Sequence, residues 1–133
     1  MRYVFNRDSN GKYGLYDSNT GEYVDGCYFD EVMLPKAFDN QSTLNVMFDR
    51  IVVKNGKCGV FSIYPKKLSI TIPCEYDVIE SAPSAWLMQK NGYWGVYDIK
   101  LRKVTLPCIC DRIIITEHEC KVLRGEEWHT LQR

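Results

Sequence analysis

The sequence predicts an all-β fold, a tandem array of antiparallel β-hairpin repeats with three units and part of a fourth. One motif recurs as NGKYGLYD at 10–17, NGKCGVFS at 55–62 and NGYWGVYD at 91–98, with a weaker copy, RGEEWHTL, at 124–131. A second motif follows each of the first three copies. Aromatic residues, which favour strands, make up 13% of the chain. Repetition at such a period is typical of arrays in which each unit packs on its neighbour.

The second motif reads EYVDGCYFDEVM at 22–33, SITIPCEYDVIE at 69–80 and KVTLPCICDRII at 103–114. Its copies agree in four columns at fixed offsets, which makes coincidence an unsatisfactory explanation. The columns are Gly26, Pro73 and Pro107; Cys27, Cys74 and Cys108; Phe29, Tyr76 and Cys110; and Asp30, Asp77 and Asp111.

The spacing between motifs divides the chain into units. We predict a single domain over 1–133, with units at about 3–33, 50–80 and 85–115 and a partial unit at 120–133. From Cys27 to Cys58 is 31 residues, whereas the two later connections, which end at Trp94 and Trp128, span 20 each. The extra residues form an insert at 33–49, which is the only segment of the sequence that could hold a helical turn.

Within a unit, local chemistry predicts three or four short strands joined by tight turns. Asn55-Gly56 and Asn91-Gly92 are strong signals for two-residue hairpins, because both positions tolerate a positive φ. The apolar runs 50–54 and 85–90 precede them, and GVF or GVY follows. A propeller-like or barrel-like closure of the array is the alternative architecture.

These motifs resemble the WG repeat family, a bacterial tandem repeat with a Lys-Trp-Gly signature. The closest copy is Asn91 to Asp98 with Leu106-Pro107, and Ile72 to Asp77 carries the Pro-Tyr-Asp half best. The resemblance covers nearly the whole chain. It departs from the pattern where Tyr13 and Cys58 replace the signature Trp and His129 replaces its Gly. The resemblance implies a repetitive β fold with a binding or scaffolding role and no catalytic residues.

The signature has a structural explanation that needs no ligand. A Trp beside a Gly allows a large ring to pack where a neighbouring backbone comes close. We therefore expect Trp94 to contribute more to stability than Trp86 or Trp128. Proline limits strand pairing, and the following Asp can accept hydrogen bonds from backbone amides in a turn.

Charge and hydropathy limit the class of partner. Lys and Arg total 17, as do Asp and Glu, so the net charge is zero and no nucleic-acid partner is expected. Residues 1–49 are net acidic and 50–133 net basic. We expect a cytoplasmic protein without a membrane partner, because neither a secretory signal nor an apolar stretch of membrane-spanning length is evident.

Six cysteines in such a chain predict reduced thiols. Cys108, Cys110, His118 and Cys120 could in principle hold zinc, and they motivate the alternative of a metal- or thiol-dependent enzyme. The repeat argues against that reading, since these cysteines fall in apolar columns: Cys110 aligns with Phe29, and Cys120 with Trp86. We expect structural cysteines, and His118 in a solvated turn.

No catalytic, metal-binding or cofactor-binding residue is predicted. The carboxylates of Asp17 and Asp98 recur in one column, and Asp30, Asp77 and Asp111 recur in another, as turn chemistry would require. No phosphate-binding loop or dinucleotide-binding motif is present. The expected protein is not an enzyme and has no cofactor.

The sequence therefore predicts a bacterial module that binds another protein, of unknown identity, and leaves the oligomeric state open. An inhibitor or immunity-type protein that blocks a toxin or defence enzyme is an alternative. Partner contacts are expected in the apolar insert, which either caps the array or binds, and in two basic turns that occupy equivalent loops. The candidate residues are Phe38, Leu44, Met47, Phe48, Lys66, Lys67, Lys100, Arg102 and Lys103.

Overall fold

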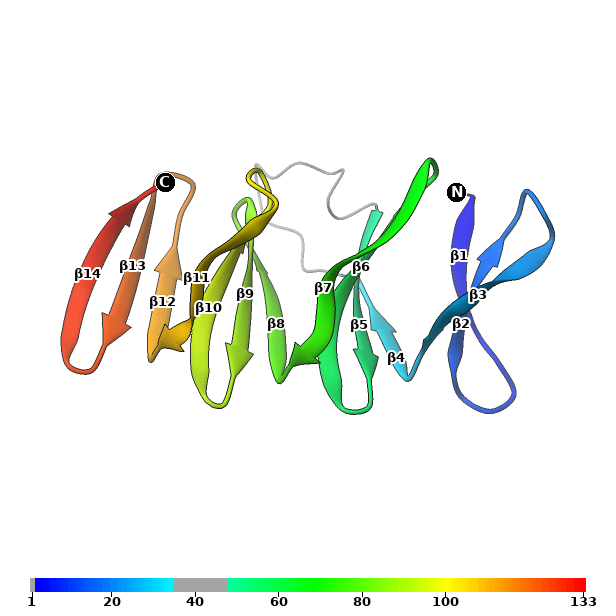
Figure 1. Ribbon diagram of the computed structural model, residues 1–133, viewed down its shortest axis with the longest axis horizontal. Helices are drawn as coiled ribbons and strands as arrows, with labels where there is room; N and C mark the ends of the chain where they lie inside the picture. Colours follow the sequence, from blue (N-terminus) through cyan, green and yellow to red (C-terminus); the bar gives the residue numbers. More distant parts are fainter. Residues whose placement is uncertain (1, 35–47) are drawn as a thin grey trace. The chain divides into compact units, whose positions relative to one another are not determined.

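The computed structural model describes residues 2–34 and 48–133, and every regular element in these ranges is a β-strand (Figure 1). The all-β prediction is therefore confirmed. The strands form four open antiparallel sheets, and none closes into a barrel. The described residues divide into two compact units, 2–34 with 48–75 and 76–133.

The first unit contains a three-stranded and a four-stranded sheet. The first sheet has the order β1-β2-β3, and the second β4-β5-β6-β7. Their strands are β1 (Tyr3–Arg7), β2 (Tyr13–Asp17), β3 (Glu22–Phe29), β4 (Glu31–Met33), β5 (Asp49–Lys54), β6 (Lys57–Tyr64) and β7 (Lys67–Tyr76).

The second unit repeats this organisation in a different phase. Its four-stranded sheet has the order β11-β10-β9-β8, and its three-stranded sheet β12-β13-β14. The strands are β8 (Val78–Ala82), β9 (Ala85–Lys90), β10 (Tyr93–Asp98), β11 (Lys103–Cys110), β12 (Arg112–Ile115), β13 (Glu119–Arg124) and β14 (Glu127–Gln132).

Sheets and sequence repeats are out of phase by one strand. The strand after each motif aspartate, such as β4 after Asp30 or β12 after Asp111, does not join the sheet of its own repeat. It becomes the first strand of the next sheet, where β4 pairs with β5 and β12 pairs with β13. The three later sheets are thus each built from two consecutive repeats, whereas the first sheet, β1-β2-β3, comes from the first repeat alone.

The motif aspartate fastens this junction. The Oδ2 atom of Asp30 accepts a hydrogen bond from the Asn55 amide at 2.8 Å, and that of Asp77 accepts one from the Asn91 amide at 3.0 Å. The Asp111 carboxylate accepts one from the Gly125 amide at 2.8 Å. Each aspartate therefore caps the hairpin turn of the following repeat, which confirms the predicted turn role.

The hairpins at 55–56 and 91–92 have the predicted turn geometry. Asn55 and Gly56 have φ values of 54° and 77°, and Asn91 and Gly92 have values of 56° and 85°. Two consecutive positive φ angles are characteristic of the type I′ turns that match the twist of paired strands.

The signature glycines allow a close backbone approach. A Cβ atom on Gly95 would lie 2.6 Å from the Leu106 carbonyl oxygen and 2.8 Å from the Pro107 carbonyl carbon. A Cβ atom on Gly59 would lie 2.4 Å from the Ile72 oxygen. The β10–β11 register shifts opposite Gly95, so the proline-containing segment bulges toward the glycine.

Apolar residues of both sheets in the first unit meet in one core. Its centre is a cluster of Phe5, Phe29 and Phe61, whose ring centroids are 5.7–6.1 Å apart and whose planes meet edge to face. Leu15 and Val52 are fully buried beside it. This aromatic packing contributes to stability beyond its buried area.

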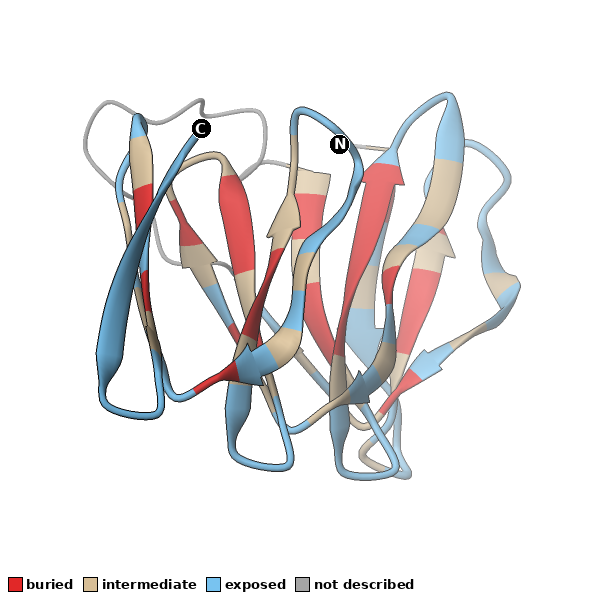
Figure 2. Cartoon of the chain, turned by 60° about the vertical axis from the view of Figure 1, so that its left-hand side comes forward, coloured by how far each residue is buried: buried red, intermediate tan, exposed pale blue. Residues whose placement is uncertain are grey.

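The second unit has its own core, formed by residues of β8, β9, β10, β11 and β13. Ala85, Val96 and Cys110 are buried together with Cys120 and Val122. Figure 2 shows that buried positions concentrate on the inner strands, whereas β14 is exposed throughout.

Among the described residues, no helix has the length and apolar character needed to cross a bilayer.

The burial of the three tryptophans does not follow the order expected for their contributions to stability. Trp86, not Trp94, is the largest fully buried side chain, with 2% exposure, whereas Trp94 is half-buried and Trp128 is 49% exposed. The Trp86 ring belongs to the central strand β9, which is paired on both sides. The glycine beside Trp94 makes room for the bulged backbone rather than for the ring.

Candidate binding surface

Each unit has a cleft lined by an aromatic residue that precedes the glycine of the first repeat motif. In the first unit the aromatic residue is Tyr13 of β2, and in the second it is Trp94 of β10. The opposite wall comes from the strand that begins the next sheet, with Val32 of β4 in one cleft and Ile113 of β12 in the other. Val32 and Ile113 both lie two residues after a motif aspartate, so the clefts are equivalent features of the repeat.

The cleft of the first unit is the larger, with a volume of about 270 Å³. Its apolar rim is accessible, since Val4 is 43% exposed, Met33 44% and Leu34 67%. Of the described lining residues, Arg50 is the one cation, and it lies among aromatic and aliphatic side chains. The lining comprises Tyr3, Val4, Phe5, Tyr13, Val32, Met33, Leu34, Arg50 and Ile63.

The cleft of the second unit is about 180 Å³ and more polar. Trp94, Leu87 and Ile113 form its apolar surface. Glu80 and Arg112 add one charge of each sign. The two equivalent clefts therefore present different chemistry, and the first is better suited to an apolar group.

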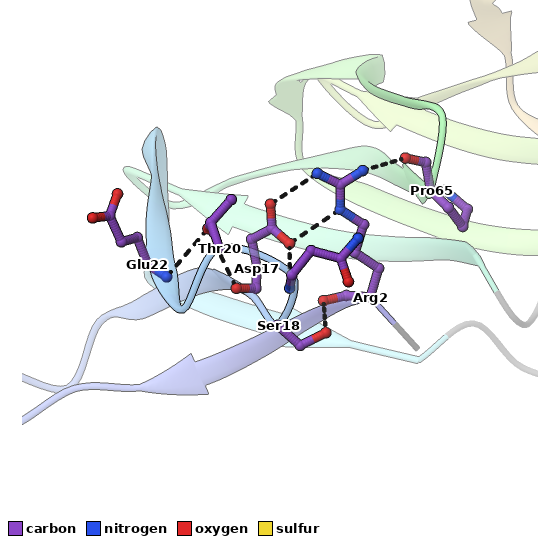
Figure 3. A network of polar contacts seen from close by, with 7 residues as sticks. Arg2, Asp17, Ser18, Thr20, Glu22 and Pro65 are labelled. Carbon is purple, nitrogen blue, oxygen red and sulfur yellow. Dashed lines mark hydrogen bonds and ion pairs between the residues drawn. The ribbon is translucent and has the colours of Figure 1, made fainter.

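Arg2 holds the basic β6–β7 turn against the first sheet (Figure 3). Its guanidinium donates two hydrogen bonds to the Asp17 carboxylate, each at 3.0 Å, and a third to the Pro65 carbonyl oxygen at 3.1 Å. The ion pair raises the pKa of Arg2 and lowers that of Asp17. Because Arg2 precedes Tyr3 of the cleft, the exposed Lys66 and Lys67 are held near the strand that lines it.

The second basic turn belongs to the other unit. Lys100 and Arg102 lie in the β10–β11 turn and Lys103 begins β11, and all three are exposed. The backbone of Arg102 has a φ of 55°, and the Asp98 carboxylate accepts a hydrogen bond from the Leu101 amide. The structure thus brings these three cations together in one loop, as the sequence predicts, and places Lys66 and Lys67 in another.

The insert is described only at its ends. Phe38, Leu44 and Met47 lie outside the described residues. Phe48 is half-buried, and its ring lies 4.8 Å from the Tyr64 ring, centroid to centroid. Phe48 therefore packs onto the end of β6, whereas Met33 and Leu34 at the other end line the cleft.

A buried polar cluster connects three strands of the second sheet. The Asp49 carboxylate on β5 accepts a hydrogen bond from the Ser62 hydroxyl on β6 at 2.6 Å, and that hydroxyl lies 2.6 Å from the Thr71 hydroxyl on β7. Asp49 is 5% exposed, and its burial raises the pKa of the carboxyl group while the Ser62 bond partly opposes the shift. The arrangement satisfies polar groups within a sheet, and the guanidinium of Arg50, a lining residue of the first cleft, donates a hydrogen bond to the Asp49 carbonyl oxygen at 2.9 Å.

The candidate zinc residues do not form a metal site. No group of three or more His, Cys, Asp or Glu side chains suited to a metal occurs among the described residues, which include these four. Cys110 and Cys120 are buried in the core, Cys108 is half-buried, and His118 is exposed in a turn. Burial raises the pKa of all three thiols, which makes them weaker nucleophiles at neutral pH.

The cysteine column has a repeated contact that the sequence did not reveal. The Cys74 thiol donates to the Val52 carbonyl oxygen at 3.8 Å, and the Cys108 thiol donates to the Met88 carbonyl oxygen at 3.4 Å. Both thiols are half-buried rather than fully buried, which corrects the core assignment for this column. None of the six cysteines forms a disulfide bond.

The clefts were not predicted from the sequence, although one column of the repeat indicates a partly exposed aromatic ring. The signature column holds Tyr13 in the first repeat and Trp94 in the third, and such exchange between large rings is compatible with a half-buried surface. The strand exchange between sheets, which places Val32 and Ile113 opposite these rings, is visible only in the structure. A comparison of this chain with models of known protein families finds no match, and a comparison with curated proteins finds none either.

Proposed function

We propose that this protein is a non-catalytic module of the bacterial cytoplasm that binds another protein through the cleft of its first unit. The observation that carries the proposal is the cleft of about 270 Å³, lined by aromatic and aliphatic side chains and bordered by the exposed Met33 and Leu34. Concave apolar surfaces with few polar groups are the usual sites for anchoring side chains.

The partner has a definable chemistry. An aromatic or aliphatic anchor side chain fits the apolar lining, and the exposed Lys66 and Lys67 near the same strand favour acidic residues beside that anchor. The Arg2 contacts to Asp17 and Pro65 support this arrangement, because they fix the turn that carries both lysines.

Copurification from the native cell, followed by identification of the partner and a titration with the purified protein, tests the proposal. We expect Met33→Asp with Leu34→Asp to abolish capture, because the charges occupy the apolar rim. Lys66→Glu with Lys67→Glu should weaken capture, with a reduced dependence on salt. Leu101→Asp, at a position 61% exposed in the other unit, is the matched control and should retain the partner.

Two results would contradict the proposal. Retention of the partner by the Met33→Asp, Leu34→Asp variant would show that the cleft is not the contact. Loss of the partner only when Lys100, Arg102 and Lys103 are replaced by Glu would move the contact to the second unit.

A further inference from the structure

Within the part of the chain that the structure describes, the strand β14 has an open edge that its counterparts lack. In the two four-stranded sheets, the third strand, β6 or β10, is paired on both sides, with β5 and β7 or with β9 and β11. β14 is the third strand of its own sheet, and among the described residues it pairs only with β13. All six of its residues are exposed (Figure 2).

The equivalence of β14 and β10 identifies the groups at this edge. Trp128 occupies the position of Trp94, so Thr130 and Gln132 occupy those of Val96 and Asp98. In β10 these three residues pair with β11, at Cys110, Leu106 and Lys103. The backbone groups of Trp128, Thr130 and Gln132 therefore face the open side, because alternate residues of a strand bond to opposite neighbours.

A fourth strand of the repeat type does not fit this edge. Beside β6 and β10, the proline-containing strand β7 or β11 comes so close that only a glycine, Gly59 or Gly95, leaves room for it. His129 stands at the equivalent position of β14, and its Cβ atom fills that space. A strand that pairs with β14 must therefore be regular, without the bulge.

β14 also lacks the features that protect the edges of β7 and β11. The outer strands β7 and β11 contain Pro73 and Pro107, and prolines, lysines and bulges are the common devices against edge-to-edge pairing. The β14 sequence, EWHTLQ, contains neither proline nor lysine, and its pairing with β13 runs without a register shift. A regular strand without such protection is available in every copy of this chain.

We propose that two copies of this protein associate through their β14 strands, which pair antiparallel about a two-fold axis at Thr130. The result is a six-stranded sheet with the order β12-β13-β14-β14-β13-β12. This register places Thr130 opposite Thr130 of the second copy, Trp128 opposite Gln132, and Glu127 opposite Arg133. It opposes no like charges, and it pairs the two threonines, a favourable cross-strand combination. The inference is independent of the proposed function.

Sedimentation equilibrium of the full chain tests the association. We expect a concentration-dependent dimer with twice the monomer mass of 15.5 kDa. Thr130→Lys should give a monomer, because two ammonium groups would then face each other across the axis. Thr105→Lys changes an exposed threonine of β11 and is the matched control, expected to dimerise like the unchanged chain. Circular dichroism verifies that both variants keep their strands.

A crosslinking variant keeps the proposal testable if Thr130→Lys fails to fold. Hydrogen-bonded residues opposite each other in antiparallel strands have Cα atoms about 5.5 Å apart, within disulfide range. Thr130→Cys should therefore form an intermolecular disulfide under mild oxidation, whereas Thr105→Cys should not. A chain that stays monomeric at all concentrations, a dimer unaffected by Thr130→Lys, growth to larger species, or no Thr130→Cys crosslink would each overturn the proposal.

Discussion

Trp86 is the side chain with the largest expected effect on stability. Its ring is 2% exposed, so Trp86→Ala should lower the free energy of unfolding by about 3–5 kcal/mol. Trp94→Ala should cost less, because that ring is half-buried at the cleft. Chemical denaturation of the two variants gives the order, and an equal or larger cost for Trp94→Ala would contradict the burial argument.

The indole N–H of Trp86 offers a finer comparison. Its Nε1 atom is buried without a hydrogen-bond partner among the described residues. A buried donor without a partner costs about 1–3 kcal/mol, so Trp86→Phe removes an unfavourable group along with part of the ring. We expect Trp86→Phe to cost much less than Trp86→Ala in the same denaturation experiment.

Gly95 is required because a side chain at this position would clash with the neighbouring backbone, and not because of its φ angle. Gly95→Ala would bring a Cβ atom to 2.6 Å from the Leu106 oxygen, a clash with backbone that must shift the bulged strand. We expect a loss of stability of about 1–3 kcal/mol or more. Gly92→Ala is the control: its φ is 85° but its Cβ atom would meet nothing within 4 Å, so its cost is limited to about 1–2 kcal/mol of backbone strain. A smaller cost for Gly95→Ala would refute this assignment.

At the scale of the strand, the junction aspartates connect one sheet to the hairpin of the next repeat. Asp77→Ala removes the acceptor for the Asn91 amide and should cost roughly 0.5–1.5 kcal/mol at this exposed site. Hydrogen exchange at the Asn91 amide should accelerate at the same time. Glu75→Ala, at an exposed position two residues earlier, is the control and should change neither quantity.

The Asp49 cluster makes the second sheet sensitive to pH. Burial raises the carboxyl pKa in the folded state above its ordinary value of 3.8, so its contribution to stability is fully present below that value. It is lost as the pH rises through the folded-state pKa, where ionisation becomes unfavourable in the buried site. Asp49→Asn can still accept the Ser62 hydrogen bond and should therefore stabilise the protein at neutral pH, with a gain that shrinks toward pH 3.8.

Denaturation at several pH values measures this gain. Asp25→Asn, an exposed position on β3, provides the comparison and should leave stability nearly unchanged. A neutral-pH loss of stability in Asp49→Asn would mean that the negative charge itself stabilises the sheet.

The sequence predicted the strands and turns because their determinants are local. The Asn-Gly pairs specify type I′ hairpins, and the aspartate column specifies caps. The assignment of strands to sheets was not predictable in the same way. The local sequence of β4, β8 and β12 would be the same whether each strand joined the sheet of its own repeat or that of the next repeat. Only the non-local pairing, such as Val32 with Val52, decides it. The clefts depend on that pairing. The sequence therefore indicated that Tyr13 and Trp94 are equivalent, but not that they line clefts.

At the scale of the whole molecule, the rate at which the thiols react with a reagent reports whether the protein is folded. Burial raises the pKa of Cys27, Cys74, Cys108, Cys110 and Cys120. Reaction with a thiol reagent should therefore be slow at neutral pH and accelerate as the pH rises, because the thiolate is the reactive form. Denaturant should expose all six groups at once, whereas several fast-reacting thiols in the native protein would contradict the burial.

The one-strand offset between repeats and sheets has a consequence for how such a chain changes by recombination. A duplication or deletion of one full period leaves every sheet with strands of the correct kind, wherever in the period its ends fall. An isolated repeat, by contrast, includes a last strand, such as β4, whose pairing partners all belong to the next repeat. Selection can therefore lengthen or shorten the array in whole periods, while a single period offers no folded intermediate on which to act.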